Sequence, residues 1–437
     1  MKTNMSRRLL LAAAAIMAAP ACVSAQEQEI VDHAAGVLDS GAEWAAAVPS
    51  DWNGVLLLWS HGYNPTLRAA EYAPSSVADA LLAKGYALAG SSYASGGWAL
   101  EDAVPDQAAT IDAFSEKFSA PETVIGWGMS MGGLVTTALA EDEESGLDGG
   151  LSLCSSMGGA VGMMNMALDG AYAFKILVAP QSDIHLVDVD DDLENLRRVQ
   201  AVLASARETR EGRARVALAA VLAGLPGWTD AKSPKPADDD IWAQEEQMAH
   251  ALPMGVFLPR TDQEKRAGGV FSWNDSVDYA AQLDRTGRRE FIEALYAEAG
   301  LELESDLKRL NEGERITAQA EHVQYMLDNY TPTAAPRVPL LAVQRVGDGM
   351  TSPALQGVYA DAAQANSGED MVKSLWIDAP GHCNFTPDEL LISIAMIAER
   401  IQTGAWPEPD EKTFTDYQPM PMQRPCFRGG ACEGLPE

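Results

Sequence analysis

The feature that most constrains the fold of this chain is a serine held between glycines after a short apolar run. Residues 124–127 form that run, Gly128-Met129-Ser130-Met131-Gly132 follows, and residues 134–140 have helical character. This order predicts a strand, a sharp turn with Ser130 at its apex, and a helix. The turn is strained and the helix starts close to neighbouring strands, so glycine is needed on both sides. The pattern therefore predicts an outward-facing Ser130 hydroxyl at the positive end of a helix.

A second serine stands in a similar setting further along the chain. Ser156-Met157-Gly158-Gly159 follows the apolar segment 150–153 and repeats the Ser-Met-Gly-Gly of the first site. Here Cys154 replaces the first glycine, so the turn cannot close as tightly. Ser130 is the predicted nucleophile and Ser156 the alternative.

The first 25 residues read as an export signal. Basic residues precede an apolar run from Leu9 to about Ala19, and small residues at 23–25 predict cleavage after Ala25. The apolar run is too short to span a bilayer, which predicts a secreted or periplasmic protein without stable membrane insertion. Both the general and the twin-arginine export routes remain open.

The full chain carries a net charge of −32, which disfavours nucleic acid and anionic membranes as partners.

Four cysteines remain after that cleavage: Cys154, Cys383, Cys426 and Cys432. An even number in an oxidising compartment predicts disulfides, and three pairings can be drawn. Cys426–Cys432 would close a small loop in the tail. Cys154–Cys383 would then tie the strand after the Ser130 helix to the loop that carries His382.

The segment before Ser130 predicts alternating strands and helices, with the helices over residues 73–84 and 105–119. Residues 26–50 suggest antiparallel edge strands, and residues 55–60 form an unbroken apolar strand of the buried, parallel kind. Because loops at the carboxyl ends of parallel strands form the ligand crevice, the loop after residue 60 should face Ser130. The backbone amides of Tyr63 and Met131 are then the predicted pair of donors to an oxyanion. His61, in the same loop, is predicted to be structural.

The rim of this crevice should carry aromatic and methionine side chains. A strand at 86–90 exits through the loop 92–98, which contains Tyr93 and Trp98. Met129 and Met157 lie near the two serines, and methionine suits an adaptable apolar pocket. These four residues are the predicted pocket, with simple core packing as the alternative.

Several of these motifs together resemble secreted bacterial members of the α/β-hydrolase superfamily. The resemblance rests on Trp52-Asn53-Gly54, His61-Gly62-Tyr63, the Ser130 motif and Gly381-His382-Cys383-Asn384-Phe385, and it covers about residues 42–157 and 336–403. It implies an α/β fold with a mostly parallel, doubly wound sheet, a serine nucleophile and ester-type substrates. The superfamily also includes peptidases, lipases and transferases.

The alternation of predicted strands and helices stops between the two segments that resemble the superfamily. Helical spacing of apolar residues dominates residues 158–335, which predicts a helical cap inserted after the strand that follows the Ser130 helix. The predicted organisation is a signal peptide (1–25), a core in two parts (26–157 and 336–404), the cap (158–335) and an irregular, cysteine-containing tail (405–437).

The remaining members of a serine site can be chosen by position. A serine hydroxyl needs a histidine base oriented by a carboxylate, and in this fold the acid and then the histidine follow the serine along the chain. His382 alone among six histidines follows a predicted sheet strand after Ser130. Asp348 leaves the preceding strand, where the superfamily keeps its carboxylate, although Pro353 comes one residue later than usual. Asp378, four residues before His382, is the alternative acid.

These residues predict a serine hydrolase that works through an acyl-enzyme, with a carboxylic ester of a small or oligomeric substrate as the expected substrate. A peptidase or amidase on the same fold, and an inactive binding protein, are the alternatives. No metal or other cofactor is predicted: the acidic run 188–192 lacks the glycine of a calcium loop. A Ser-x-x-Lys match at Ser305 lacks its partner motifs. Oligomeric state and substrate identity are not predicted.

Overall fold

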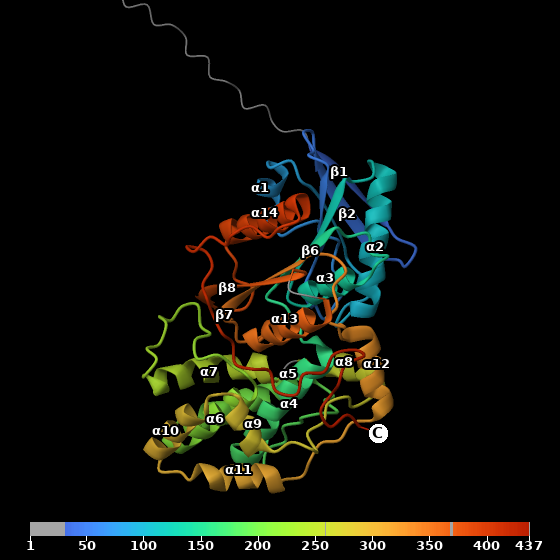
Figure 1. The fold of residues 1–437 in the computed structure, drawn as a ribbon. Coiled ribbons are helices and arrows are strands. Elements are labelled where there is room, and N and C mark those ends of the chain that lie inside the picture. Colours follow the sequence, from blue (N-terminus) through green and yellow to red (C-terminus); the bar gives the residue numbers. More distant parts are fainter. Residues whose placement is uncertain (1–30, 258, 368–369, 437) are drawn as a thin grey trace, which may run out of the picture.

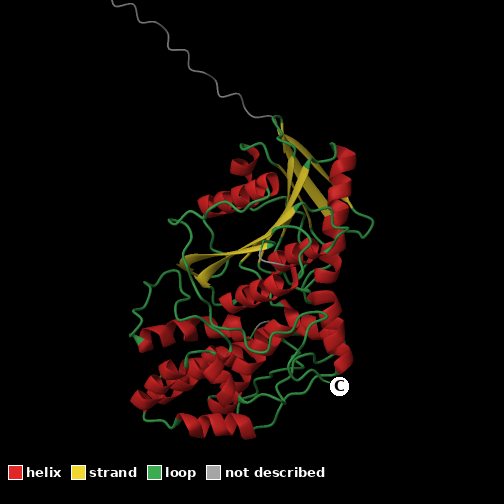
Figure 2. Ribbon diagram, in the orientation of Figure 1, coloured by secondary structure: helices red, strands yellow, loops and turns green. Residues whose placement is uncertain are grey.

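One eight-stranded sheet organises the computed structural model of the chain, which describes residues 31–257, 259–367 and 370–436 (Figures 1 and 2). The strands are β1 (Val31–Val37), β2 (Glu43–Pro49), β3 (Val55–Ser60), β4 (Ala87–Ser91), β5 (Thr123–Met129), β6 (Gly149–Leu153), β7 (Leu340–Gly347) and β8 (Val372–Pro380). Their order in the sheet is β1-β2-β4-β3-β5-β6-β7-β8. β1 and β2 are antiparallel additions at one edge, and from β4 to β8 every neighbouring pair is parallel. The predicted α/β-hydrolase fold is confirmed.

Helices cover both faces of the sheet (Figure 1). Those of the core are α1 (Ala78–Leu82), α2 (Leu100–Lys117), α3 (Met131–Glu141), α13 (Pro353–Ser367) and α14 (Pro387–Thr403). α2 and α3 pack on one face together with a cluster that includes Phe114 and Leu134. α1 and α14 pack on the other face, around Trp127 and Ile394. Strands β3, β5 and β6 are buried along most of their length, which explains why they contain few polar residues.

The order of the strands creates a crevice at one point of the sheet. From β3 the chain adds β4 on one side, and it then crosses to add β5 on the other side. Ligands of open α/β sheets bind where the order reverses in this way, beyond the carboxyl ends of the strands. β3 ends directly before His61-Gly62-Tyr63 and β5 ends directly before Ser130, so the fold places the two predicted halves of the site side by side.

A helical layer lies beyond the carboxyl edge of the sheet (Figure 1). Its helices are α4 (Gly159–Leu177), α5 (Asp192–Ala206), α6 (Arg210–Leu222), α7 (Ile241–Val256), α8 (Thr261–Ala267), α9 (Tyr279–Arg285), α10 (Arg289–Ala299), α11 (Leu303–Glu312) and α12 (Ala320–Tyr330). Many of them share an apolar core of their own, which includes Phe174, Leu218 and Leu295. Ser352 donates to the Gly224 carbonyl at 2.7 Å, so the layer touches the loop after β7. The precise boundaries of a cap, 158–335, stay a prediction.

The tail joins this helical layer to the sheet. Thr415 forms a bridge with Trp376 of β8, and further along the tail Arg424 is buried against Asp169 of α4, with Nη2 and Oδ2 2.9 Å apart. Arg424 also donates to the carbonyl oxygens of Asn165 and Trp273. The described residues after Gly404 form no helix, and the buried ion pair anchors this segment to α4.

Replacing Arg424 with methionine therefore leaves the buried Asp169 carboxylate without its cation. We expect the free energy of unfolding to fall by about 3–5 kcal/mol, because removing one partner of a buried pair strands the other charge. Urea unfolding measures the loss. Arg428→Met is the matched control, since Arg428 is exposed, and its change should stay within about 0.5 kcal/mol; equal losses for the two variants would contradict this role of Arg424.

Two helices differ from their predicted bounds. The helix expected over 73–84 is only the five-residue α1, and α2 begins at Leu100 rather than at Pro105. A proline is typical of the first turn of a helix, but Pro105 follows an additional first turn that begins with Leu100, which is buried. The stabilisation gained by burying that turn outweighs the preference of proline for the first turn of a helix. Among the described helices, none has the length and apolarity needed to cross a bilayer. The predicted signal peptide (1–25) lies outside the described residues.

Candidate active site

The predicted strand, turn and helix around Ser130 are confirmed. Ser130 stands between β5 and α3 with φ 58° and ψ −124°, a strained conformation for a residue other than glycine. The flanking glycines are required by space: a Cβ on Gly128 would lie 2.3 Å from the Gly132 carbonyl oxygen, and one on Gly132 would lie 2.0 Å from the Ser60 carbonyl oxygen. Backbone cannot yield to such contacts. The tight packing therefore holds the Ser130 side chain out at the start of α3.

Three side chains predicted from distant parts of the sequence meet at this point. Ser130 Oγ lies 3.0 Å from His382 Nε2, and His382 Nδ1 lies 2.9 Å from Asp348 Oδ2. Asp348 is fully buried and follows β7, whereas His382 follows β8 and keeps a side chain about one-fifth exposed. The distances are those of a hydrogen-bonded chain from hydroxyl to imidazole to carboxylate.

The carboxylate of Asp348 is oriented by its own loop. The backbone N–H groups of Met350 and Thr351 donate to Oδ1 at 2.9 and 3.0 Å. Thr351 Oγ1 lies 3.0 Å from Asp348 Oδ2, 2.8 Å from the Cys154 carbonyl oxygen and 3.2 Å from His382 Nδ1. Sequence reasoning missed Thr351. Its only signal was a hydroxyl three residues after an aspartate, the spacing of a local side-chain to backbone turn.

Thr351→Val removes that hydroxyl but keeps the shape of the side chain. We expect kcat to fall by up to about tenfold, because one hydrogen bond worth about 0.5–1.5 kcal/mol no longer holds the carboxylate and the imidazole in place. Steady-state kinetics of the folded variant gives the value. Thr351→Ser keeps the hydroxyl and should retain near wild-type kcat. A Val variant as active as the Ser variant would show that the hydroxyl has no part in orienting the site.

The loop after β3 passes directly beside Ser130. A Cβ on Gly62 would lie 3.2 Å from the Met129 carbonyl oxygen and 3.4 Å from Ser130 Cβ, so the backbone of 61–63 lies against the turn. Met131 is the first residue of α3, and the first amides of a helix have no partner within it. The amides of Tyr63 and Met131 thus belong to two backbone segments that adjoin Ser130.

The side chains of His61 and Tyr93 pack against the backbone of this loop. The ring nitrogens of His61 lie 2.8 and 3.3 Å from the carbonyl oxygens of Gly62 and Ser92, and burial lowers its pKa. The ring of Tyr93 stacks on it with centroids 4.0 Å apart, and the Tyr93 hydroxyl donates to the His61 carbonyl at 3.0 Å. Both side chains therefore have structural partners, in line with the prediction for His61.

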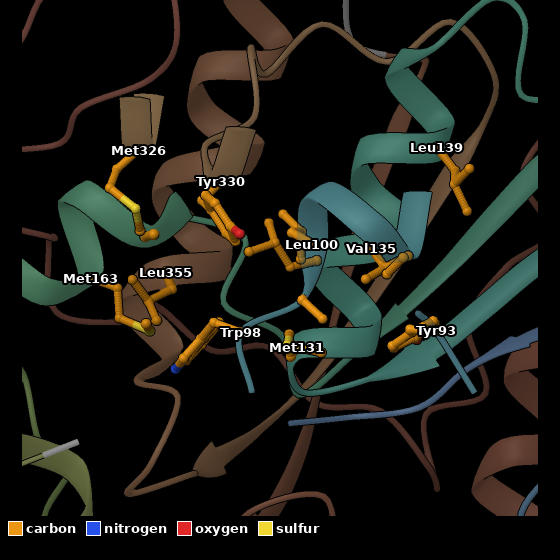
Figure 3. Packing of buried hydrophobic residues seen from close by; sticks show 14 of the residues in the cluster. Tyr93, Trp98, Leu100, Met131, Val135, Leu139, Met163, Met326, Tyr330 and Leu355 are labelled. Atoms are coloured by element: carbon orange, nitrogen blue, oxygen red, sulfur yellow. The ribbon is translucent and has the colours of Figure 1, made fainter. Parts of the chain in front are cut away.

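The predicted pocket is only partly supported. Tyr93 and Met157 have no exposed surface, so the prediction that they line an open pocket is wrong: packing against the loop after β3 buries Tyr93, and packing within the core buries Met157. Trp98 lies in one buried cluster with Met131 of α3 and Met163 of α4 (Figure 3), and its ring is 5.8 Å from that of Tyr63. Met129 is partly exposed beside Ser130. Trp98 and Met129 remain the pocket candidates.

The alternative nucleophile and the alternative acid lie away from the contacts described above. Ser156 is fully buried and its hydroxyl has no hydrogen-bond partner among the described residues. Asp378 is exposed and pairs with Lys235 at 2.5 Å instead of turning towards His382. Neither residue has the contacts that Ser130 and Asp348 have.

Both hypothesised disulfides are present. Cys154 is bonded to Cys383 and Cys426 to Cys432. Cys154, His382 and Cys383 are close enough together to suggest a metal site, but both sulfurs are already bonded to each other and are not free thiolates. Acyl transfer, rather than metal chemistry, suits this arrangement.

No family model matches the chain. It is 30% identical over 417 residues to the o-phthalyl amidase of Xanthobacter agilis, a match that covers 86% of this chain and 89% of the amidase. Among solved structures, an esterase from Pyrococcus furiosus has a TM-score of 0.40 at 13% identity and covers 85% of this chain and 91% of its own. Feruloyl esterase B from Aspergillus oryzae has a TM-score of 0.44 at 12% identity, with coverage of 86% and 82%.

The amidase match covers most of both chains at 30% identity. The chain therefore belongs to the family of the o-phthalyl amidase and is a serine hydrolase with the α/β-hydrolase fold.

Proposed function

We propose that Ser130 is the nucleophile of an amide hydrolase that works through an acyl-enzyme. The observation that carries this proposal is the chain of contacts from Ser130 Oγ through His382 to Asp348. His382 takes the Ser130 proton as Oγ attacks the carbonyl carbon, and the carbonyl oxygen becomes an oxyanion beside the Tyr63 and Met131 amides. His382 then returns the proton to the leaving nitrogen as the C–N bond breaks. Water, deprotonated by His382, releases the acid and restores the Ser130 hydroxyl.

The choice of an amide rests on family membership. The sequence patterns favoured a carboxylic ester, with an amidase as the alternative, and the X. agilis relative is named for an o-phthalyl amide. An amine leaves poorly unless it is protonated, and His382 Nε2, 3.0 Å from the Ser130 oxygen, is close enough to supply that proton. We therefore propose amides of an aromatic acid of the o-phthalyl type as substrates.

Trp98 and Met129, the two remaining pocket candidates, are the proposed contacts of the aromatic acyl group. The ring of Trp98 lies near Tyr63, whose amide is one of the proposed oxyanion donors. An aromatic side chain on this side of the site would hold a flat acyl group by burial and ring contact.

The proposal is tested with paired substrates that share one acyl group. A chromogenic o-phthalyl amide and the o-phthalyl ester of a comparable alcohol are compared with short p-nitrophenyl esters, each with the wild-type protein and with Ser130→Ala. We expect turnover of the phthalyl amide that depends on Ser130, and higher kcat/KM for phthalyl than for short acyl groups. Ser130-dependent turnover of esters with none of any amide would restore the ester hypothesis and reject the amide.

Export is proposed on two grounds. The N-terminal sequence has the three parts of a signal peptide, and the described part of the chain contains two disulfides, which persist in oxidising compartments. N-terminal sequencing of protein recovered from outside the cytoplasm should begin at Gln26. Intact Met1 on exported material would contradict the proposed cleavage.

A further inference from the structure

Cys154 occupies a central place among the three residues of the site. It directly follows β6, and the carbonyl of its neighbour Leu153 accepts the backbone N–H of Ser130 at 3.0 Å. Its own carbonyl lies 2.8 Å from the Thr351 hydroxyl, which also contacts Asp348. Its sulfur is bonded to Cys383. One strand end is thus connected to the segments that carry the serine, the carboxylate and the histidine.

Cys383 brings this connection to the imidazole. It directly follows His382, and its Sγ lies 3.4 Å from Nε2, the nitrogen that faces Ser130 Oγ. On the other side of His382 the loop is fixed by the Gly381 N–H, which donates to the Gly347 carbonyl at 3.0 Å. Residues 381–386 form no helix or strand before α14 begins. The disulfide is therefore a covalent support for the loop immediately after the histidine.

We propose that the Cys154–Cys383 disulfide is a positioning element of the active site, and that its reduction reversibly lowers turnover. This inference rests on the proposed catalytic roles of Ser130 and His382. With the bond intact, Nε2 stays at hydrogen-bond distance from Oγ. When it is broken, the 381–386 loop moves and fewer molecules hold the two atoms in line. A misplacement of about 1 Å in such a site costs about a hundredfold in rate.

The reduction can be written for a small dithiol such as dithiothreitol. Cys154 is fully buried but Cys383 is partly exposed, so one thiolate of the reagent attacks the Cys383 sulfur and displaces the Cys154 thiolate. The second thiol of the reagent then displaces Cys383 and forms the cyclic disulfide of the reagent. Two electrons pass to the protein, and the two cysteines take up two protons.

The other disulfide of the chain supplies a matched control. Cys426–Cys432 closes a short loop in the tail, whereas Cys154–Cys383 joins positions 229 residues apart beside the site. One variant carries Cys154→Ala with Cys383→Ala, and the control carries Cys426→Ala with Cys432→Ala. Circular dichroism at the assay temperature shows that each is folded, which is needed because a disulfide that closes a long loop also stabilises the fold.

For the Cys154/Cys383 variant we expect kcat to fall about ten- to a hundredfold, with KM changed by less than about threefold. The control variant should keep wild-type kcat and should still lose activity in dithiothreitol, with recovery on reoxidation. The Cys154/Cys383 variant should not respond to the reagent. If that variant does not fold, the control variant is treated with dithiothreitol instead. Its activity and its circular dichroism spectrum, measured together, then show whether reduction of Cys154–Cys383 lowers turnover in a folded protein.

Wild-type kcat in a folded Cys154/Cys383 variant would overturn the inference. An undiminished kcat in the folded control variant would do the same, once thiol counting shows that reduction has freed two more cysteines. Labelling by a fluorophosphonate separates this failure from that of the proposed function. An oxidised wild-type protein that is labelled at Ser130 but is indifferent to reduction rejects only the positioning role. An oxidised protein that is not labelled at Ser130 rejects the proposed function itself.

Discussion

Replacing Ser130 with alanine is expected to lower kcat by roughly 10⁴- to 10⁶-fold while the protein stays folded. The reason is that Ser130 is the hydroxyl that contacts His382 Nε2, at 3.0 Å, and alanine has no oxygen to form the acyl-enzyme. The methyl group of alanine fits where the serine side chain stood, so the circular dichroism spectrum should not change. Single-turnover and steady-state assays on the o-phthalyl amide measure the loss.

Ser156→Ala is the matched control for this prediction. Ser156 lies in the sequence that imitates the Ser130 motif, but it is fully buried without a hydrogen-bond partner among the described residues. Its replacement should leave kcat within about threefold of wild type, since no proposed catalytic contact is lost. A large loss with Ser156→Ala, and none with Ser130→Ala, would move the nucleophile to the second motif.

Asp348→Asn is expected to lower kcat by about 10⁴-fold. Two backbone N–H groups, those of Met350 and Thr351, donate to Oδ1 of Asp348. An asparagine must therefore place its oxygen at Oδ1, and its NH₂ group then faces His382 Nδ1. The imidazole is forced to accept at Nδ1 and to carry its proton on Nε2, so it cannot take the proton of Ser130. Backbone geometry thus makes the wrong tautomer the stable one.

The control for this change is Asp378→Asn. Asp378 is exposed and bound to Lys235, so its neutralisation should leave kcat near the wild-type value. The two variants are compared in the same steady-state assay over pH 6–9. Equal losses, or a large loss confined to Asp378→Asn, would mean that the carboxylate has been assigned to the wrong loop.

The predictable parts of the site are those for which a few neighbouring residues indicate the structure. Glycines at 128 and 132 report backbone packing too tight for a Cβ, and His382 follows an apolar strand after the nucleophile. Such signals depend on a few consecutive residues. The sheet could be predicted for the same reason, because strands buried along most of their length contain few polar residues.

The parts that were missed depend on segments far apart in the chain. Thr351 contacts Cys154 across 197 residues, and no local pattern distinguishes that hydroxyl from any other in a loop. Tyr93 and Met157 were placed at an open rim because their loops were correctly located, but the packing of neighbouring elements buries both. Whether a residue at the rim is buried depends on the elements that pack against it. The helical layer supplies some of these elements, and its sequence contained the fewest local signals.

The proposed activation of Ser130 by His382 is tested most directly by covalent labelling. The oxidised protein is treated with a fluorophosphonate, digested, and the modified peptide is identified by mass spectrometry. We expect one adduct, on Ser130, whose rate of formation falls at least about a thousandfold in His382→Ala. An adduct on Ser156, or labelling of Ser130 at the same rate without His382, would contradict the proposed activation.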